Sequence, residues 1–201
     1  MLDIDTLAWE KMDSLLPAIV QDAFDGRVLM QGYMNRQALE RTLTSGRVTF
    51  WSRSRQALWI KGETSGHFLE LVQVVADCDN DSLLVLAHPQ GPVCHRDTPT
   101  CFDCEGKQTP SLLYLAELER LVAQRERERP ARSYTTELLE SGVRRIAQKV
   151  GEEGVETALA AASGSDAELL SESADLLYHL LVLLRARNLG LEQLMKVLML
   201  R

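Results

Sequence analysis

The pattern of apolar residues changes near residue 105, and this change divides the chain into two differently built parts. Before it, short runs rich in β-branched and aromatic residues predict strands at residues 18–23, 28–34, 47–51, 68–76 and 83–87. One helix interrupts these strands, with Asn35 as its N-cap and Gly46 just beyond its end. After Pro110, apolar residues recur at helical spacing throughout. We therefore predict an α+β protein, with a β-rich domain over residues 1–110 and an all-α helical bundle over residues 111–201.

Composition narrows the class of protein. The chain of 201 residues is 45% hydrophobic, enough for one large core or two small ones. The net charge of −7 is shared between residues 1–110 and residues 111–201, and neither part has the basic excess typical of nucleic-acid binding. Residues 1–5 lack the features of a signal peptide, and the apolar run 176–184 is too short to span a bilayer. These features predict a cytoplasmic protein that binds neither nucleic acid nor membrane.

A set of side chains suited to binding metals lies in the last third of the β-rich part: Asp77, Cys78, Asp79, Asp81, Cys94, His95 and Cys101. Carboxylate oxygens suit Mg²⁺, whereas thiolates suit Zn²⁺, so the set predicts two different metals used for hydrolytic chemistry. If residues 77–81 form an extended strand, the three aspartates share one face and Cys78 points to the other. A zinc ion on Cys78 would then lie across the strand from the carboxylate metal, or belong to a site completed by another subunit.

Other interpretations of this set exist. An EF-hand is excluded, because its sixth position would be Ser82 rather than glycine and its twelfth would be His88 rather than glutamate. An acidic surface turn remains the alternative for the carboxylates taken alone. Four cysteines are consistent with two disulfides in a secreted protein, but without an export signal metal ligation in a reducing cytoplasm is favoured. Cys101 and Cys104 also form a C-x-x-C, so a closed four-cysteine zinc site is a further alternative.

The helical part contains an E-E-x-x-E…E-x-x-D pattern of five carboxylates: Glu152, Glu153, Glu156, Glu172 and Asp175. Residues three and four apart share a helix face, so Glu152 and Glu156 lie together with Glu153 beside them. The loop at residues 163–165 makes the two helices antiparallel neighbours, and both acidic groups then converge. Converging like charges repel unless a cation lies between them. The pattern therefore favours a Mg²⁺ site for triphosphate chemistry over two solvated charged faces.

Several blocks of sequence resemble known enzymes. The first half resembles phosphoribosyl-AMP cyclohydrolase in the metal motifs and in these blocks: residues 16–22 (LPAIVQD), 28–30 (VLM), 33–35 (YMN), 51–55 (WSRSR) and 58–66 (LWIKGETSG). The second half resembles phosphoribosyl-ATP pyrophosphohydrolase in these blocks: residues 133–135 (SYT), 149–156 (KVGEEGVE) and 172–179 (ESADLLYH). The whole chain resembles the bifunctional enzymes of histidine biosynthesis. The resemblance implies that the second domain converts phosphoribosyl-ATP to phosphoribosyl-AMP and pyrophosphate. The first domain would then open the adenine ring between N1 and C6.

The resemblance also implies roles for the metal set. Cys78, Cys94 and Cys101 match three zinc ligands of a site assembled across a homodimer, in which the counterpart of Cys78 comes from the partner chain. Such a zinc keeps one open position for water, whose pKa it lowers toward ~7. His95 matches the catalytic histidine, although it alternatively only donates a hydrogen bond to a thiolate. The three aspartates match magnesium ligands that hold the substrate phosphate or position water. Cys104 lies outside the family's pattern, so we expect it to be structural or incidental.

Substrate contacts in the first half are expected from five residues: Trp51, Ser52, Arg53, Arg55 and Lys61. Arginine pairs with phosphate through two parallel hydrogen bonds, and tryptophan stacks on a base, so these residues suit a nucleotide with two monophosphates. The alternative is a polar strand edge with two core tryptophans, Trp51 and Trp59. His67 and His88 are expected to be ordinary surface or core residues.

In the second half, the resemblance implies that all five carboxylates bind Mg²⁺ and that Glu153 is catalytic. Lys149 and Arg145 are expected to contact phosphate, and His179 is expected to pack within the bundle. Two other functions remain open from the sequence. One is a housecleaning nucleotide pyrophosphohydrolase with a non-catalytic zinc module, which would hydrolyse ordinary nucleoside triphosphates. The other is a binding or assembly protein that metals stabilise but that turns over no substrate.

Overall fold

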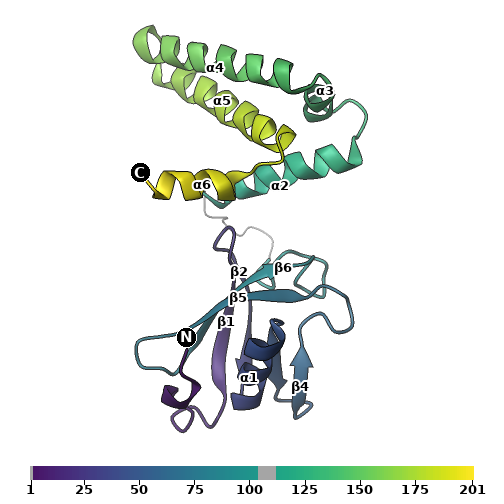
Figure 1. The fold of residues 1–201 in the computed structure, drawn as a ribbon, viewed down its shortest axis with the longest axis vertical. Helices are drawn as coiled ribbons and strands as arrows, with labels where there is room; N and C mark the ends of the chain where they lie inside the picture. Colours follow the sequence, from purple (N-terminus) through teal and green to yellow (C-terminus); the bar gives the residue numbers. More distant parts are fainter. Residues whose placement is uncertain (1, 104–111) are drawn as a thin grey trace. The chain divides into compact units, whose positions relative to one another are not determined.

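The computed structural model describes residues 2–103 and 112–201 (Figure 1). The chain forms two compact units, Met1–Gln108 and Thr109–Arg201. The predicted domain boundary after residue 110, like Cys104, lies outside the described residues. All strands of the described ranges belong to the first unit, and the second is helical, which confirms the predicted α+β class. No helix within these ranges combines the length and apolarity that crossing a bilayer requires.

A four-stranded sheet organises the first unit. Its strands lie in the order β2 (Val28–Met34), β1 (Leu16–Asp22), β6 (Leu83–Pro89) and β5 (Leu69–Ala76). The β1 and β6 strands run parallel, and the other neighbours are antiparallel. The unit also contains the elements η1 (Ile4–Thr6), α1 (Arg36–Ser45), β3 (Thr49–Ser52) and β4 (Ala57–Ile60). The pattern did not predict β4, which pairs with β3 but has only four residues.

The two faces of the sheet differ in burial. One face carries the core, in which Leu16, Val20 and Val85 are fully buried against residues that include Leu39 of α1 and Phe50 of β3. On the other face, a row of three apolar side chains crosses neighbouring strands in register: Ile19, Leu84 and Val75. Their exposed fractions are 40%, 37% and 40%. The described chain therefore leaves an apolar stripe, the Ile19–Leu84–Val75 row, open on this face.

Local signals of the sequence set the bounds of α1 and its attachment to the sheet. The Asn35 side chain accepts a hydrogen bond from the Ala38 N–H at 2.8 Å, and Gly46 ends the helix at a φ of +70°, as predicted. Gly32 of β2 lies under the Phe50 ring, which a Cβ there would approach to 2.4 Å. The missing side chain thus lets the β3–β4 hairpin pack closely on the sheet.

Residues 112–201, the described part of the second unit, form five helices: α2 (Leu113–Glu128), α3 (Tyr134–Glu140), α4 (Val143–Ser163), α5 (Asp166–Ala186) and α6 (Leu191–Met199). The α4 and α5 helices lie side by side, and a short loop joins them (Figure 1). Ser165 and Glu168 form a capping box at the start of α5, as the Ser-x-x-Glu spacing favours. A small core of Val122, Leu138, Ile146 and Val182 holds α2 to α5 together.

Candidate functional site

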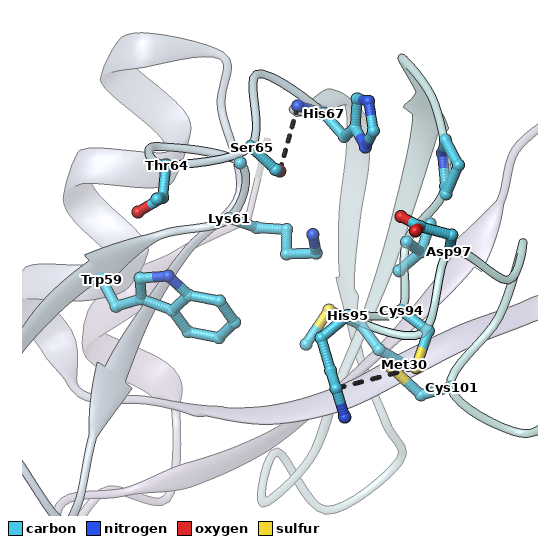
Figure 2. A pocket seen from close by; sticks show the side chains of 13 residues that line it. Met30, Trp59, Lys61, Thr64, Ser65, His67, Cys94, His95, Asp97 and Cys101 are labelled. Carbon is cyan, nitrogen blue, oxygen red and sulfur yellow. Dashed lines mark hydrogen bonds between the residues drawn. The ribbon is translucent and has the colours of Figure 1, made fainter.

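A pocket of about 480 Å³ lies in the first unit, where the segment that follows β6 forms part of its lining (Figure 2). It contains four of the residues predicted to be functional: Lys61, Cys94, His95 and Cys101. The pocket is also lined by Met30, Trp59, Gly62, Thr64, Ser65, His67, Pro92, Val93 and Asp97. Its volume falls in the range of small-molecule sites. The fold therefore gathers thiols, imidazoles and an ammonium group in one concave site.

A tight turn after β6 brings Cys94 and Cys101 together. The backbone N–H groups of Val93 and Cys94 both donate to the Thr98 carbonyl, at 3.1 and 3.0 Å, and Asp97 adopts a φ of +58°. The chain then returns to the sheet, where the Thr100 hydroxyl and the Cys101 N–H bond to backbone carbonyls at the start of β2. Both cysteines thus face the same pocket although six residues separate them.

The electrostatics of this turn suit metal ligation by thiolate. The backbone N–H of Arg96 is the main cause that lowers the pKa of Cys94 to about 7, and the Arg96 side chain, Thr98 and Cys101 contribute. Loss of solvent raises the pKa of Cys101, and the charge of Cys94 raises it further. Two thiols that compete for ionisation at close range fit a soft cation, which stabilises both as thiolates. His95 lies alongside, with Nδ1 3.8 Å from Cys94 Sγ.

Lys61 is the cation of this pocket. Its side chain is 8% exposed and extends into the pocket, and burial lowers the pKa of its ammonium group (Figure 2). Within the described ranges this ammonium has no ion-pair partner, which suits an anionic ligand. The next residue, Gly62, has a φ of +94°, and a Cβ there would lie 2.5 Å from the His67 carbonyl. Glycine therefore permits the loop that returns Thr64, Ser65 and His67 to the pocket.

The other substrate residues predicted in the first half, Trp51, Ser52, Arg53 and Arg55, lie on the β3–β4 hairpin and do not line this pocket. Arg53 places its guanidinium 3.9 Å from the centre of the Tyr33 ring, and Arg55 Nε donates to the Ser52 hydroxyl at 3.4 Å. Trp51 is half-buried, whereas Trp59 lines the pocket. Conversely, sequence reasoning missed Thr64, Ser65, His67, Asp97 and Met30 as pocket residues. The glycines at positions 62 and 66 are the sequence signal that could have indicated a loop there.

The acidic run at residues 77–81 is not a strand, so the predicted alternation of its side chains is wrong. Strand β5 ends at Ala76, and residues 77–82 form the turn that leads into β6. The Asp77 carboxylate accepts from the N–H groups of Asp81 and Ser82, and Asn80 has a φ of +59°. These local bonds favour a turn over an extended chain.

The turn nevertheless brings the three predicted magnesium ligands together. Ligand oxygens of Asp77, Asp79 and Asp81 all lie within 4.8 Å of one another. Lys11 forms ion pairs with Asp79, at 2.6 Å, and with Asp81. The ammonium group lowers the pKa of Asp79, and both carboxylates raise the pKa of Lys11. Three hard oxygen donors in one turn fit a Mg²⁺ ion.

Cys78 lies far from the other two predicted zinc ligands. It is exposed in the turn before β6, whereas Cys94 follows the other end of that strand. Seven residues of β6 separate these ends, and such a strand spans ~20 Å. Zinc–sulfur bonds are about 2.3 Å long, so a single chain cannot bring Cys78 to the ion that Cys94 and Cys101 would hold.

A second acidic site lies between α4 and α5. Ligand oxygens of Glu153, Glu156 and Glu172 lie within 4.8 Å of one another, and Glu153 is only 5% exposed. Desolvation raises the pKa of Glu156, and the charges of Glu153 and Glu172 raise it further. The three carboxylates therefore repel one another, and a divalent cation bound between them would remove this repulsion. The structure thus joins three of the five carboxylates of the predicted motif.

The other two carboxylates, Glu152 and Asp175, do not belong to the group whose ligand oxygens lie within 4.8 Å of one another. Glu152 accepts hydrogen bonds from Lys149, at 2.9 Å, and from Gln148, at 2.8 Å, and Arg145 lies 3.4 Å away. Asp175 is exposed one turn after Glu172. Lys149 also pairs with Glu153 at 2.8 Å, and this contact is the main cause that lowers the pKa of Glu153. Lys149 and Arg145, predicted to contact phosphate, therefore pair with carboxylates in this structure.

Two families match the chain, one for each unit. The phosphoribosyl-AMP cyclohydrolase family matches residues 30–103, which include the pocket and the acidic turn. The phosphoribosyl-ATP pyrophosphohydrolase family matches residues 115–201, which include the glutamate cluster. The two matches follow the same order along the chain as the β-rich and helical units.

Curated relatives match over nearly the whole chain. The histidine biosynthesis bifunctional protein HisIE of Photobacterium profundum is 56% identical, over 94% of this chain and 92% of the relative. The protein of the same name from Salmonella typhimurium is 58% identical, over 92% of this chain and 90% of the relative. That of Xylella fastidiosa is 62% identical, over 96% and 91%. This chain therefore belongs to the family of histidine biosynthesis bifunctional proteins HisIE, in which a cyclohydrolase domain precedes a pyrophosphohydrolase domain.

Proposed function

We propose that the helical unit hydrolyses phosphoribosyl-ATP to phosphoribosyl-AMP and pyrophosphate, and that the β-rich unit then opens the adenine ring of phosphoribosyl-AMP. The observation that carries this proposal is that each unit holds a cluster of ligand side chains inside its own family match. The order of the domains is thus the reverse of the order of the reactions. A housecleaning pyrophosphohydrolase is disfavoured, because the cyclohydrolase half carries a pocket with thiols and an imidazole.

Ring opening requires water to add to C6, the N1–C6 bond to break and N1 to gain a proton. Zinc held by Cys94, Cys101 and the partner's Cys78 would supply the activated water, since zinc lowers the pKa of water toward ~7. His95 moves the proton from the water to N1, because its ring lies beside Cys94 on the pocket wall. Trp59 presents an aromatic face to the base, since its ring lines the same pocket. Replacing the imidazole of His95 would therefore slow proton transfer, while the other residues that line the pocket would remain in place.

The two phosphates of phosphoribosyl-AMP need separate cationic contacts. Lys61 binds one of them, because its ammonium is buried in the pocket without an ion-pair partner among the described residues. Arg53 and Arg55 bind the other from the exposed β3–β4 turn. Trp51 and Ser52 support this turn, and Ser52 accepts a bond from the Arg55 side chain. Mg²⁺ on Asp77, Asp79 and Asp81 would neutralise further phosphate charge.

The cyclohydrolase site is completed in a homodimer. Cys78 cannot reach Cys94 and Cys101 within one chain, because the length of β6 separates them. The Ile19–Leu84–Val75 row offers a partly exposed apolar sheet face, and a second copy would cover it. In a two-fold dimer each chain gives its Cys78 and acidic turn to the other chain's pocket. The free thiols suit a reducing cytoplasm, where they stay available to zinc.

In the helical unit, Glu153, Glu156 and Glu172 would hold Mg²⁺, and Glu152 and Asp175 are the further carboxylates of the same two helices that would complete its ligand set. Mg²⁺ would neutralise the triphosphate during attack by water on phosphorus. Lys149 keeps the buried Glu153 ionised, since their ion pair at 2.8 Å lowers the pKa of that carboxyl. With a metal bound to the glutamates, the ammonium of Lys149 would be available to a substrate phosphate. Arg145, bound to Glu152 at 3.4 Å, offers a second cation on the same helix.

The proposed function is tested by incubating the full chain with phosphoribosyl-ATP, Mg²⁺ and trace zinc. Pyrophosphate release and ring opening are followed separately, the second also with phosphoribosyl-AMP supplied directly. Both activities are expected. Hydrolysis of ordinary nucleoside triphosphates without ring opening would instead support the housecleaning enzyme, and metal-dependent stability without turnover would support a binding protein.

The Cys94→Ser variant is expected to lose its bound zinc, because a catalytic zinc with an open position needs all three protein ligands. Its rate of ring opening should fall by at least about 100-fold. Cys104→Ser, the matched control, should keep both. Zinc content measured by atomic absorption, together with the ring-opening rate, checks the result. If Cys104→Ser also loses its zinc, a closed four-cysteine site replaces the three-ligand site.

A further inference from the structure

Two hydrogen bonds fix the ring of His179, which lies beside the buried glutamate of the helical unit. The Tyr134 hydroxyl lies 2.9 Å from His179 Nε2, and His179 Nδ1 lies 2.8 Å from the Asp175 carbonyl. The same Nδ1 lies 3.6 Å from Glu153 Oε1. His179 and Glu153 are 4% and 5% exposed. The histidine expected only to pack in the bundle therefore stands between a tyrosine and the carboxylate cluster.

These partners determine which ring nitrogen carries the proton. A backbone carbonyl only accepts hydrogen bonds, so Nδ1 of His179 must be the donor to Asp175. In the neutral ring Nε2 is then an acceptor, and the Tyr134 hydroxyl donates to it. The tyrosine thus stabilises the tautomer whose N–H group lies beside Glu153. Lys149 contacts the same Oε1 at 2.8 Å, so this oxygen has a cation on one side and the imidazole on the other.

We propose that Tyr134 and His179 are positioning residues of the pyrophosphohydrolase site, which hold the Glu153 carboxylate in the orientation that Mg²⁺ requires. The inference rests on the proposed function of the helical unit. Groups that hold metal ligands in place contribute about 10–100-fold to metal affinity or activity. Neither residue needs to touch the substrate for this effect, because each acts through Glu153.

The structure provides a matched control on the same two helices. The Tyr178 hydroxyl of α5 bonds the Thr135 hydroxyl of α3 at 2.8 Å, next to the Tyr134–His179 bond. Both tyrosines belong to one aromatic cluster, in which their rings lie 6.2 Å apart. Removing either hydroxyl breaks one α3–α5 hydrogen bond. Only the bond of Tyr134 goes to the His179 ring, which lies 3.6 Å from Glu153, so Tyr134→Phe and Tyr178→Phe separate positioning from helix packing.

The test measures both activities of the full chain over a range of Mg²⁺ concentrations. Tyr134→Phe is expected to raise the Mg²⁺ concentration for half-maximal pyrophosphate release about tenfold. Its KM for phosphoribosyl-ATP, measured at saturating Mg²⁺, should stay within about twofold of the wild-type value. Tyr178→Phe should match the wild type, and ring opening should be unchanged in both. His179→Asn, which keeps an N–H group near the position of Nδ1, should retain more activity than His179→Leu.

A spectroscopic readout accompanies the kinetics. Imidazole ¹⁵N NMR should show the Nδ1–H tautomer of His179 in the wild type and in Tyr178→Phe, and a mixture of tautomers in Tyr134→Phe. Equal losses in Tyr134→Phe and Tyr178→Phe would reduce the effect to helix packing, and no loss in either would overturn the positioning role. A wild-type chain that releases no pyrophosphate would instead overturn the proposed function itself.

Discussion

Glu153→Gln is expected to reduce pyrophosphate release by at least about 100-fold, while ring opening of supplied phosphoribosyl-AMP stays within about twofold. Glu153 is the most buried carboxylate of its cluster, and it lies within 4.8 Å of the ligand oxygens of Glu156 and Glu172. The amide keeps the shape of the side chain but removes the charge that a divalent cation needs. It also leaves Lys149 without its closest anion.

Glu140→Gln serves as the control for Glu153→Gln. Glu140 belongs to the same unit, and its half-exposed carboxylate pairs only weakly with Arg129, at 3.4 Å. This variant should keep both activities. Circular dichroism and the midpoint of thermal unfolding verify that each variant is folded. A folded Glu153→Gln protein that loses both reactions would contradict the assignment of the two reactions to two separate sites.

Mixing two inactive variants is expected to restore ring opening. Cys78→Ser and Cys94→Ser should each lose at least about 100-fold alone, because each homodimer lacks a zinc ligand in both of its sites. In a mixed dimer one site has both lesions, whereas the other takes Cys78 from one chain and Cys94 from its partner. Random pairing at equal amounts should therefore recover roughly one quarter of the wild-type activity in a two-fold dimer.

Pyrophosphate release is the internal control of the mixing experiment, because its carboxylates lie in the helical unit and should be indifferent to the pairing. Differently tagged chains, purified over both tags, establish that mixed dimers have formed. Pairs that form without any gain in ring opening would show that Cys78 does not contribute to its partner's zinc site. Its exposed position before β6 would then need another explanation.

Patterns local in sequence predicted most of the fold. The caps at Asn35, Gly46 and Ser165 were predictable, because each depends on bonds within a few residues of the helix end. The apolar periods likewise placed the strands of the sheet and indicated that the second half is helical. Strand β4 was missed, because its four residues are too few to show a recognisable alternation of apolar and polar side chains. The acidic turn was mistaken for a strand, because alternating aspartates match both an extended chain and a turn held by Asp77.

The site was only partly predictable, because its residues come from distant segments. The sequence singled out Lys61, Cys94, His95 and Cys101, and the fold gathers them in one pocket. It did not single out His67, whose position depends on the Gly62 turn. For the glutamates, helical spacing grouped Glu152 with Glu156, yet the structure gathers Glu153, Glu156 and Glu172. Glu152 instead pairs with Lys149 and other neighbours on its own helix.

The sequence by itself determined the kinds of chemistry that this chain carries, since thiols, carboxylates and their spacing are properties of the chain. It also determined that a β-rich half precedes a helical half, because the apolar period changes between them. Only the tertiary structure decided which of these groups meet. Cys94 joins Cys101 through a tight turn, whereas Cys78 stays at the opposite end of β6. The physical reason is that a rigid extended strand keeps its two ends apart, whereas a turn closes the chain on itself.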